Sequence, residues 1–255
     1  MHLPVSVNLY WDCFYTEDRL EEVKKTFEVN LINPLFDRII CYYSTKNKNN
    51  YFPELSNKVS LIEIRSNHPY FDDLFHLTNH YTSPYDINII CNNDIIFGKW
   101  DKRLLNAKLL PDSFFCLSRH ELLESWGDYT IENLPKYNPQ LLSCSQDVWI
   151  YRGKIRPTFG HFHVGSCWGL DEVISEESFR NGFFPSNPSK SFPSFHNHLS
   201  NIRINWPNAE NKSKHMYTHR RGQCQLTPYD ANEDVPYPSV HFFDFELPTY
   251  TPLLI

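Results

Sequence analysis

The chain lacks several features that would place it in a well-marked class of protein. No apolar run approaches the roughly 18 residues that a membrane-spanning helix needs, so the sequence predicts no transmembrane segment. Nothing at Met1-His2-Leu3-Pro4 resembles a signal peptide, and we therefore expect a cytoplasmic protein. Internal repeats and low-complexity tracts, which would indicate a solenoid or a disordered segment, are also missing from the sequence.

Charge and cysteine patterns exclude two further classes. The formal net charge is −6, and basic residues occur only in short runs. Nucleic-acid binders usually carry a basic stripe, so we expect no nucleic-acid partner. Seven cysteines occur without any Cys-x-x-Cys spacing, and Cys41 and Cys91 lie inside apolar runs. This pattern favours buried free thiols over a disulfide framework or a zinc site.

What the sequence does contain is enough apolar material for a packed α/β core. Hydrophobic residues make up 41% of the 255 positions, and the first half alternates short apolar runs with stretches of helical spacing. Continuous apolar runs are typical of strands covered on both faces, and alternation of strands with helices indicates a mainly parallel sheet. The predicted strands are 5–11, 38–43, 59–64 and 87–91, and the predicted helices are 17–29, capped by Thr16, and 71–81.

The second half has a different character. Residues 114–118 and 148–151 resemble further strands, and residues 170–180 a further helix, whereas the chain from Asn205 is rich in Pro, Asn and Tyr with little periodicity. We expect a Rossmann-like three-layer α/β/α sandwich with a mixed, mainly parallel sheet over residues 1–204. Residues 205–255 are expected to form an irregular extension that packs on this domain.

The sharpest local feature is the segment 89–97, which reads Ile-Ile-Cys-Asn-Asn-Asp-Ile-Ile-Phe. A buried strand ends there in three polar residues before the sequence turns apolar again. In open α/β sheets, ligands bind beyond the carboxyl ends of the strands, and a carboxylate at that position can hold Mg²⁺ or Mn²⁺. An ordinary turn is the alternative, because Asn and Asp favour turns in any case.

The triplet Asn92-Asn93-Asp94 resembles the DxD motif of GT-A glycosyltransferases, in the Asn-x-Asp form found in a set of bacterial and viral enzymes. Other segments resemble the same set in the same chain order, and together they cover roughly residues 5 to 204. They are Arg65 with Tyr70-Phe71-Asp72, the strand 116–121, Ser145-Gln146-Asp147-Val148-Trp149, the Gly-rich stretch 165–171, and the block from Gly182 to Arg203.

This resemblance implies a GT-A-like fold and transfer of a sugar from a nucleotide-sugar donor, with UDP the leading expectation, to a carbohydrate acceptor. Asp94 is expected to hold Mn²⁺ or Mg²⁺ against the donor diphosphate, and His198, in the pair His196-Asn197-His198, to complete the metal's ligands. The expected donor-binding residues are Arg65, Asp72, Asn92, Asn93, Asp94 and Arg119.

Two carboxylates are candidates for the catalytic base of an inverting transfer, in which a base deprotonates the acceptor hydroxyl. Asp171 follows Trp168-Gly169 and opens a predicted helix, where Trp168 is expected to stack on the acceptor sugar; Asp147 is the second candidate. The alternative for Asp171 is a charge that is favourable at a helix N-terminus.

Two other functions remain open at the level of sequence. Asn92 stands where the DxD motif has its first Asp, which lowers the negative charge of the site and favours a non-catalytic module that binds a sugar nucleotide or a glycan. A metal-dependent hydrolase built on Asp94, His196 and His198 is the second alternative, against which the lack of a dense second His/Asp cluster argues.

Overall fold

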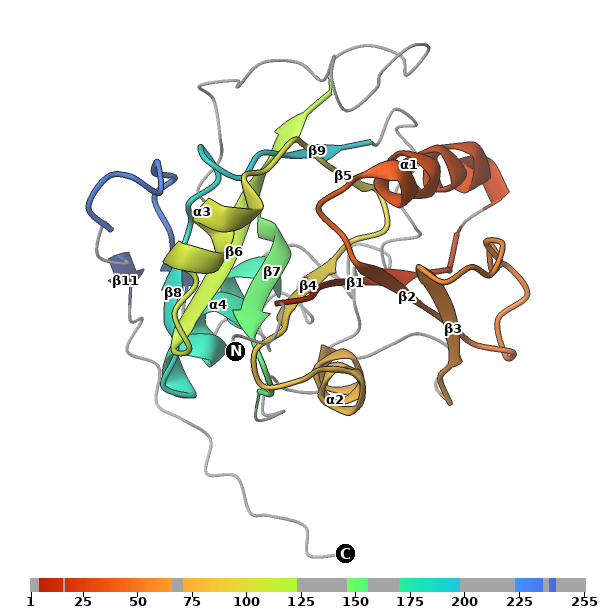
Figure 1. Cartoon of the computed structure of the whole chain (residues 1–255), viewed down its shortest axis with the longest axis horizontal. Coiled ribbons are helices and arrows are strands. Elements are labelled where there is room, and N and C mark those ends of the chain that lie inside the picture. The colour runs from red at the N-terminus through yellow and green to blue at the C-terminus, as the bar shows by residue number, and fades with distance from the viewer. Residues whose placement is uncertain are drawn as a thin grey trace, which may run out of the picture.

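The computed structural model describes residues 5–15, 17–65, 71–122, 146–155, 170–197, 223–235 and 239–241. Over these ranges the chain is an α/β protein with one large curled sheet and helices packed against it (Figure 1). The strand order is β3 (Val59–Glu63), β2 (Arg38–Tyr43), β1 (Val7–Asp12), β4 (Ile87–Cys91), β7 (Gln146–Arg152), β6 (Ser113–Glu121), β9 (Ser194–His196) and β5 (Ile95–Phe97), and β8 (Phe184–Ser186) pairs with β6 outside this path. β1 and β4 therefore lie near the centre of the sheet.

The sheet is mixed and mainly parallel, as the sequence predicts. The first four strands, β1 (Val7–Asp12), β2 (Arg38–Tyr43), β3 (Val59–Glu63) and β4 (Ile87–Cys91), pair in parallel. β7 (Gln146–Arg152) runs antiparallel between β4 and β6 (Ser113–Glu121). β8 (Phe184–Ser186) and β9 (Ser194–His196) are parallel to β6, and β5 (Ile95–Phe97) is antiparallel to β9.

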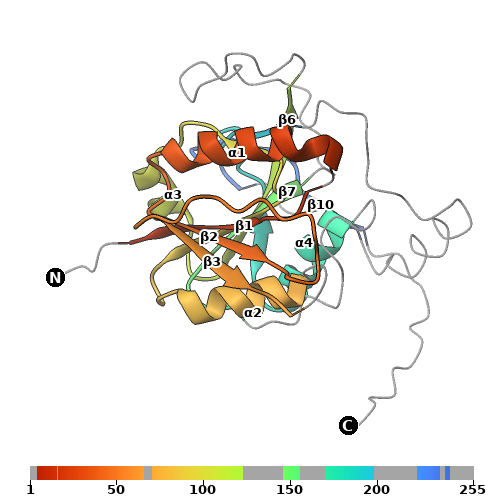
Figure 2. The same cartoon turned by 90° about the vertical axis from the view of Figure 1, so that its right-hand side faces the viewer.

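Helices cover both faces of the sheet. α1 (Leu20–Ile32) and α3 (Lys102–Lys108) lie on one face, and α2 (Phe71–Tyr81) and α4 (Leu170–Arg180) on the other (Figure 2). A short 3-10 turn, η1 (Glu17–Arg19), precedes α1. Within the described ranges, no helix has the length and apolar character needed to cross a membrane.

Strand alternation explains why the core divides into two layers. Successive side chains of a strand point to opposite faces, so Leu9 and Trp11 of β1 join the cluster under α1 and α3, whereas Tyr10 joins the cluster under α2 and α4. All five residues of β4 are buried. The continuous apolar runs of the sequence therefore mark strands that are covered on both sides, as predicted.

The predicted elements agree with the structure most closely where the apolar pattern is long. The bounds of β2, β4, α2 and α4 match the prediction, whereas the helix predicted at 17–29 begins as η1 and continues as α1 to Ile32. Arg19 occupies the N-cap position of α1 without a side-chain cap. The short elements β5, β8, β9 and α3 were missed, because three to seven residues carry too little periodicity.

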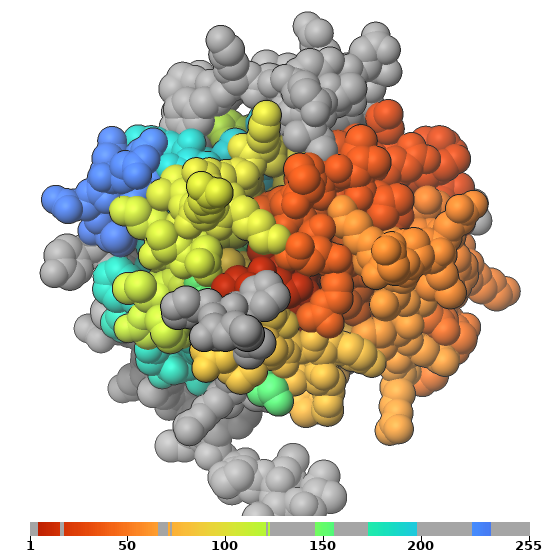
Figure 3. Space-filling model, viewed as in Figure 1, coloured from red at the N-terminus to blue at the C-terminus, as the bar shows by residue number. Residues whose placement is uncertain are grey.

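The described part of the C-terminal extension packs on the sheet. Leu226 and Ala231 belong to the two core clusters, and β10 (Gln223–Gln225) pairs antiparallel with β11 (Ser239–His241). The Asn187 side chain donates to the Leu226 carbonyl at 3.0 Å and to the Ser118 hydroxyl at 2.8 Å, so it connects the extension to β6. In the space-filling view this segment, in blue, lies at the left beside the yellow and green residues (Figure 3).

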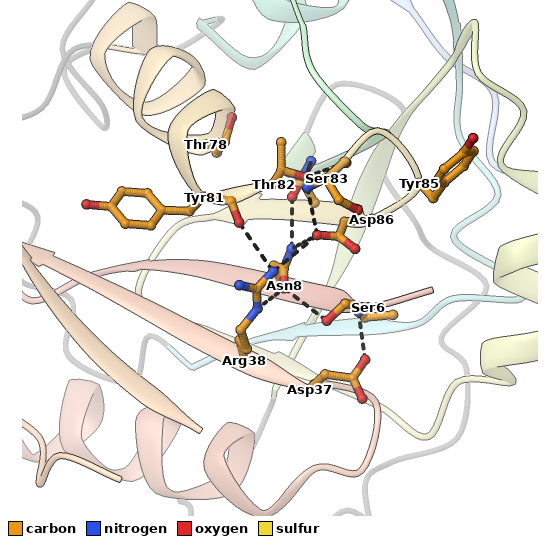
Figure 4. Close-up of polar contacts among 12 residues, drawn as sticks. Ser6, Asn8, Asp37, Arg38, Thr78, Tyr81, Thr82, Ser83, Tyr85 and Asp86 are labelled. Atoms are coloured by element: carbon orange, nitrogen blue, oxygen red, sulfur yellow. Dashed lines mark hydrogen bonds and ion pairs between the residues drawn. The ribbon is translucent and has the colours of Figure 1, made fainter. Parts of the chain in front are cut away.

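A partly buried polar network lies at the amino end of the sheet, where β1, β2 and β4 begin (Figure 4). The side-chain nitrogen Nδ2 of Asn8 lies 3.4 Å from Asp86 Oδ2 and 3.3 Å from Asn88 Oδ1. The Arg38 guanidinium donates to Asn8 Oδ1 at 2.9 Å and to Asp86 Oδ2 at 3.1 Å. The Ser83 N–H also donates to Asp86 at 2.9 Å. The polar groups of this network supply one another's hydrogen bonds and connect three parallel strands. We therefore assign the network a structural role.

Four of the seven cysteines can be described fully. Cys13, Cys41, Cys91 and Cys116 are buried free thiols. They confirm, for these positions, the prediction that the cysteines fill the core rather than form disulfides.

Candidate functional site

Polar side chains gather at the opposite, carboxyl end of the central strands. β1 ends at Asp12, β4 runs into Asn92, Asn93 and Asp94, and β6 carries Arg119 near its end. β7 is antiparallel to β4, so its beginning, with Asp147, lies at the same edge. We call these residues, together with Arg19 and His196, the carboxyl-edge cluster.

Asp94 is the centre of the first group of contacts in this cluster. Its residue is only 6% exposed, although it lies in a turn in which the Ile95 N–H donates to the Asn92 carbonyl at 3.3 Å. The Oδ2 atom accepts from Arg19 Nη2 at 2.8 Å and lies 3.1 Å from His196 Nε2. The turn expected from the Asn and Asp residues is therefore present, but a turn alone does not require a buried carboxylate held by a guanidinium and an imidazole.

The surrounding elements hold this group in place. β9 pairs His196 with Ile95, directly after Asp94, and the Asn197 N–H donates to the Asp94 carbonyl at 2.7 Å. The Asn197 side chain donates to the Glu22 carbonyl at 3.0 Å and to the Thr26 hydroxyl at 2.9 Å, which ties β9 to α1. The start of α1, the end of β9 and the β4–β5 turn therefore form one connected unit.

Arg19 carries the positive charge of this unit. Its Nε atom donates to Glu22 Oε2 at 2.9 Å, while Nη2 binds Asp94. Burial acts to lower the pKa of Arg19, but the neighbouring Asp94 and Glu22 carboxylates outweigh burial and raise it. Arg19 is thus a permanent cation that neutralises Asp94 in the ligand-free protein.

A second group of contacts links Asn92, Asp147 and Arg119. Asn92 Nδ2 donates to Asp147 Oδ1 at 2.6 Å, and Arg119 Nη1 donates to Asp147 Oδ2 at 2.6 Å. Asp147 is 2% exposed, whereas the Arg119 side chain keeps 18% of its surface in solvent. Arg119 therefore extends from a buried anchor toward the surface, an arrangement suited to a phosphate contact.

An irregularity in β6 directs Arg119 toward this edge. The pairing of β6 with β7 shifts register between Leu117 and Ser118, and beyond that point Arg119 pairs with Ser194 of β9. Bulges of this kind bend a strand and change the direction of the side chains that follow. His120, the next residue, is buried and stacks on Phe195, and burial lowers its pKa to about 4. It is therefore neutral at neutral pH.

Asn93 forms the third group of contacts, with the end of β1. Its side chain donates to the Asp12 carbonyl at 3.3 Å and to the carbonyl of Phe14. Burial raises the pKa of Asp12 to about 7, and the Phe14 N–H, which donates to this carboxylate at 3.0 Å, lowers the pKa in part. The neighbouring Tyr42 hydroxyl is buried and has no hydrogen-bond partner among the described residues. Asp12, which is half-buried, is thus a carboxyl that a polar ligand at this edge could contact, whereas Tyr42 is fully buried.

Asp94 Oδ2 and His196 Nε2, which lie 3.1 Å apart, are an oxygen and a nitrogen atom of this cluster that could bind a divalent ion. One carboxylate and one imidazole would leave the other positions to phosphate oxygens and water. The described residues contain no group of three or more His, Cys, Asp or Glu side chains that could hold an ion without such help.

The structure also locates the remaining residues expected from the sequence. Arg65 is exposed and lies two residues after the end of β3. Asp72 is the second residue of α2, and the first turn of α2 lies at the edge of the sheet where β3 ends. Asp171 is the second residue of α4, as predicted, but its side chain lies outside the described part. Trp168 and His198 also lie outside the described residues, so their roles stay predictions.

Two members of the carboxyl-edge cluster, Asp12 and Arg19, are not predicted from the sequence. Asp12 could have been found, because it directly follows a predicted strand, and the rule that drew attention to Asp94 applies to it equally. Arg19 stands in the acidic run Glu17-Asp18-Arg19-Leu20-Glu21-Glu22 and gives no signal. For His196, the sequence indicates only a histidine pair in which His198 is the expected ligand.

No protein-family model matches this chain, and no curated protein matches its sequence.

Proposed function

We propose that this chain is a metal-dependent glycosyltransferase with a GT-A-like fold, which transfers a sugar from a nucleotide-sugar donor, UDP being the leading expectation, to a carbohydrate acceptor with inversion. The observation that carries the proposal is the buried Asp94 in the turn that follows the carboxyl end of the central strand β4, where it is held by Arg19 and His196. It coincides with the Asn-x-Asp form of the DxD motif.

The position of the cluster supports a ligand site rather than a purely structural role. In α/β sheets the crevice beyond the carboxyl ends of the strands is where ligands bind. Here that edge collects Asp12, Asn93, Asp94, Asp147 and Arg119 from four different strands or their following turns. By contrast, the polar network at the amino end of the sheet is closed upon itself (Figure 4).

The charges of the cluster suit a diphosphate. Arg119 is partly exposed beside Asp147, and Arg19 and His196 lie against Asp94. In the proposal, Asp94 and His196 would hold Mn²⁺ or Mg²⁺, which would supply Lewis-acid stabilisation of the diphosphate leaving group. Arg19, beside Asp94, is the cation nearest to such an ion and would suit contact with phosphate oxygens.

Asp147 suits a positioning role better than that of the base. Both of its carboxylate oxygens already accept hydrogen bonds, from Asn92 and Arg119. We therefore assign Asp147 to positioning Arg119 and Asn92, and retain Asp171 as the proposed base, with Trp168 against the acceptor. Ser175, one turn after Asp171, contacts Gln146, so α4 begins near the start of β7.

A non-catalytic module that binds a sugar nucleotide is the second candidate. The ion pair between Arg19 and Asp94 favours it, because a carboxylate that is already neutralised has less need of a metal ion. Both candidates use the same edge of the sheet, but only the first releases free nucleotide.

Turnover separates the two candidates. The protein is incubated with a panel of UDP-, GDP- and CMP-sugars and a mixture of oligosaccharide acceptors, with Mn²⁺ or with a chelator, and nucleotide release is followed together with the mass of the acceptor. We expect release that requires Mn²⁺ and is at least about 10²-fold slower in Asp171→Asn, the loss typical of a missing base. Binding without release in every combination would favour the module.

A further inference from the structure

Two histidines lie one turn apart on the outer surface of α2, outside the carboxyl-edge cluster. His76 and His80 are both exposed, and their Nε2 atoms are 3.3 Å apart. The ring centroids are 4.9 Å apart and the ring planes meet at 82°. Residues four apart on a helix are neighbours on one face, so this spacing brings two imidazole nitrogens together by backbone geometry alone.

The distance between the nitrogens is the one that a tetrahedral metal ion requires. Two Zn–N bonds of about 2.05 Å at an angle of about 109° hold their nitrogens roughly 3.3 Å apart. In the absence of an ion, one imidazole donates a hydrogen bond to the other across this distance. A metal ion would replace that single proton without a change in the spacing of the two rings.

The helix that carries the pair is firmly anchored. Phe71, Leu74 and Phe75 on its inner face belong to the core. The Asn79 side chain, between the two histidines in sequence, donates to the Ile155 carbonyl at 2.5 Å and accepts from the Ile155 N–H at 2.9 Å. A ligand pair on a fixed helix loses little conformational freedom when it binds, which favours chelation.

We propose that His76 and His80 form a two-histidine chelate for a late transition-metal ion, such as Zn²⁺, Ni²⁺ or Cu²⁺. No third His, Cys, Asp or Glu side chain completes a metal group with them in the described ranges. Water therefore fills the remaining positions, and binding is weaker than at a closed four-ligand zinc site.

The identity of the ion follows from the ligand chemistry. Imidazole suits Zn²⁺, Cu²⁺ and Ni²⁺, with Cu²⁺ bound most tightly, whereas Mg²⁺ and Mn²⁺ prefer oxygen ligands. The ion expected at the histidine pair thus differs from the one proposed at Asp94. The chelate on α2 is independent of sugar transfer, and its test does not depend on activity.

Metal titration of the full chain tests the chelate. The protein is stripped of metal with a chelator, and Ni²⁺ binding is measured by calorimetry for wild type, His76→Gln, His80→Gln and the double variant. Gln is a good helix former, and both positions are exposed, so all four proteins should fold alike by circular dichroism. We expect wild type to bind one more Ni²⁺ than each variant, with Mg²⁺ titrations identical throughout.

The double variant makes the comparison decisive. Because chelation needs both rings, removing one histidine should abolish the site, and removing the second should cause no further loss of Ni²⁺ binding. Equal Ni²⁺ binding in wild type and the double variant would overturn the proposal. If each single variant lost part of the Ni²⁺ binding and the double variant lost the sum of both parts, the proposal would equally be overturned, because the two imidazoles would then bind Ni²⁺ independently.

Discussion

Arg19 connects the carboxylates of Glu22 and Asp94, and its substitution removes the guanidinium from both at a site where side chains are about nine-tenths buried. Removing one partner from a buried ion pair usually costs several kcal/mol. We expect Arg19→Gln to lower the free energy of unfolding by about 3 kcal/mol in metal-free buffer, as measured by urea denaturation.

The same variant should respond to Mn²⁺ more strongly than wild type. An ion that binds only the folded state stabilises it by mass action, and in Arg19→Gln it has no guanidinium to displace from Asp94. Mn²⁺ should therefore raise the melting temperature of the variant well above any effect on wild type. Arg103→Gln, at an exposed position of α3, is the matched control. An equal response of all three proteins would contradict competition at Asp94.

Asp12 should make the stability of the protein depend on pH, because burial raises the pKa of its carboxyl to about 7 from an ordinary value near 4. The folded state then binds more protons than the unfolded state between about pH 4 and pH 7, so this residue makes stability fall as the pH rises through that window. Above pH 7 its effect is constant. Asp12→Asn keeps an oxygen for the Phe14 N–H and removes the titration.

The variant should therefore gain stability relative to wild type as the pH rises from about 5 to about 8. Asp12 is half-buried as a residue, so after allowance for solvent we expect a relative gain on the order of 2 kcal/mol, measured by urea denaturation at both pH values. Glu54→Gln, which removes a charge at an exposed position, is the control. A pH dependence that is identical in wild type and Asp12→Asn would refute the assignment.

At the scale of secondary-structure elements, the attachment of α1 to β5 depends on buried asparagines. Asn30 Nδ2 donates to the Ile95 carbonyl at 2.8 Å, and its Oδ1 accepts from the Phe97 N–H at 3.1 Å. These bonds satisfy backbone groups of a three-residue strand and hold the start of that strand next to Asp94.

Asn30→Ala removes both bonds and leaves two buried backbone groups unsatisfied, each at a cost of about 1–3 kcal/mol. We expect a total destabilisation of about 3 kcal/mol in urea denaturation. Glu28→Ala, on the exposed side of the same helix, should change stability by less than about 0.5 kcal/mol. If the two variants proved equally stable, the clamp between α1 and β5 would have no energetic role.

The elements also show which parts of the fold can be predicted from sequence. β2, β4, α2 and α4 were predicted to the residue, because long apolar runs or helical repeats define them. β5 and β9 have three residues each and are held by buried asparagines and by partners far along the chain. Local periodicity carries no information on such contacts, so these strands were missed.

At the scale of the whole molecule, the same division applies to the site. Asp94 was predictable because it ends a buried strand, and the strand order then brings Asp147 and Arg119 to the same edge. The contact of Arg19 with Asp94 spans 75 positions of sequence, and it exists only because α1 packs beside the β4–β5 turn. The sequence therefore predicted the central carboxylate and part of its surroundings, but not the cation that neutralises it.

The central claim is that Asp94 binds a metal ion together with a nucleotide-sugar donor, and donor titration tests it most directly. UDP-glucose and other members of the nucleotide-sugar panel are titrated by calorimetry into wild type and Asp94→Asn, each with Mn²⁺ and with a chelator. Asp94→Asn combined with Arg19→Gln controls for the guanidinium that loses one of its two carboxylate partners in the single variant. The account predicts that Mn²⁺ tightens donor binding at least about tenfold, or about 1.4 kcal/mol, in wild type and in neither variant. Equal affinity for the donor in all these titrations, or no binding by any nucleotide sugar, would contradict it.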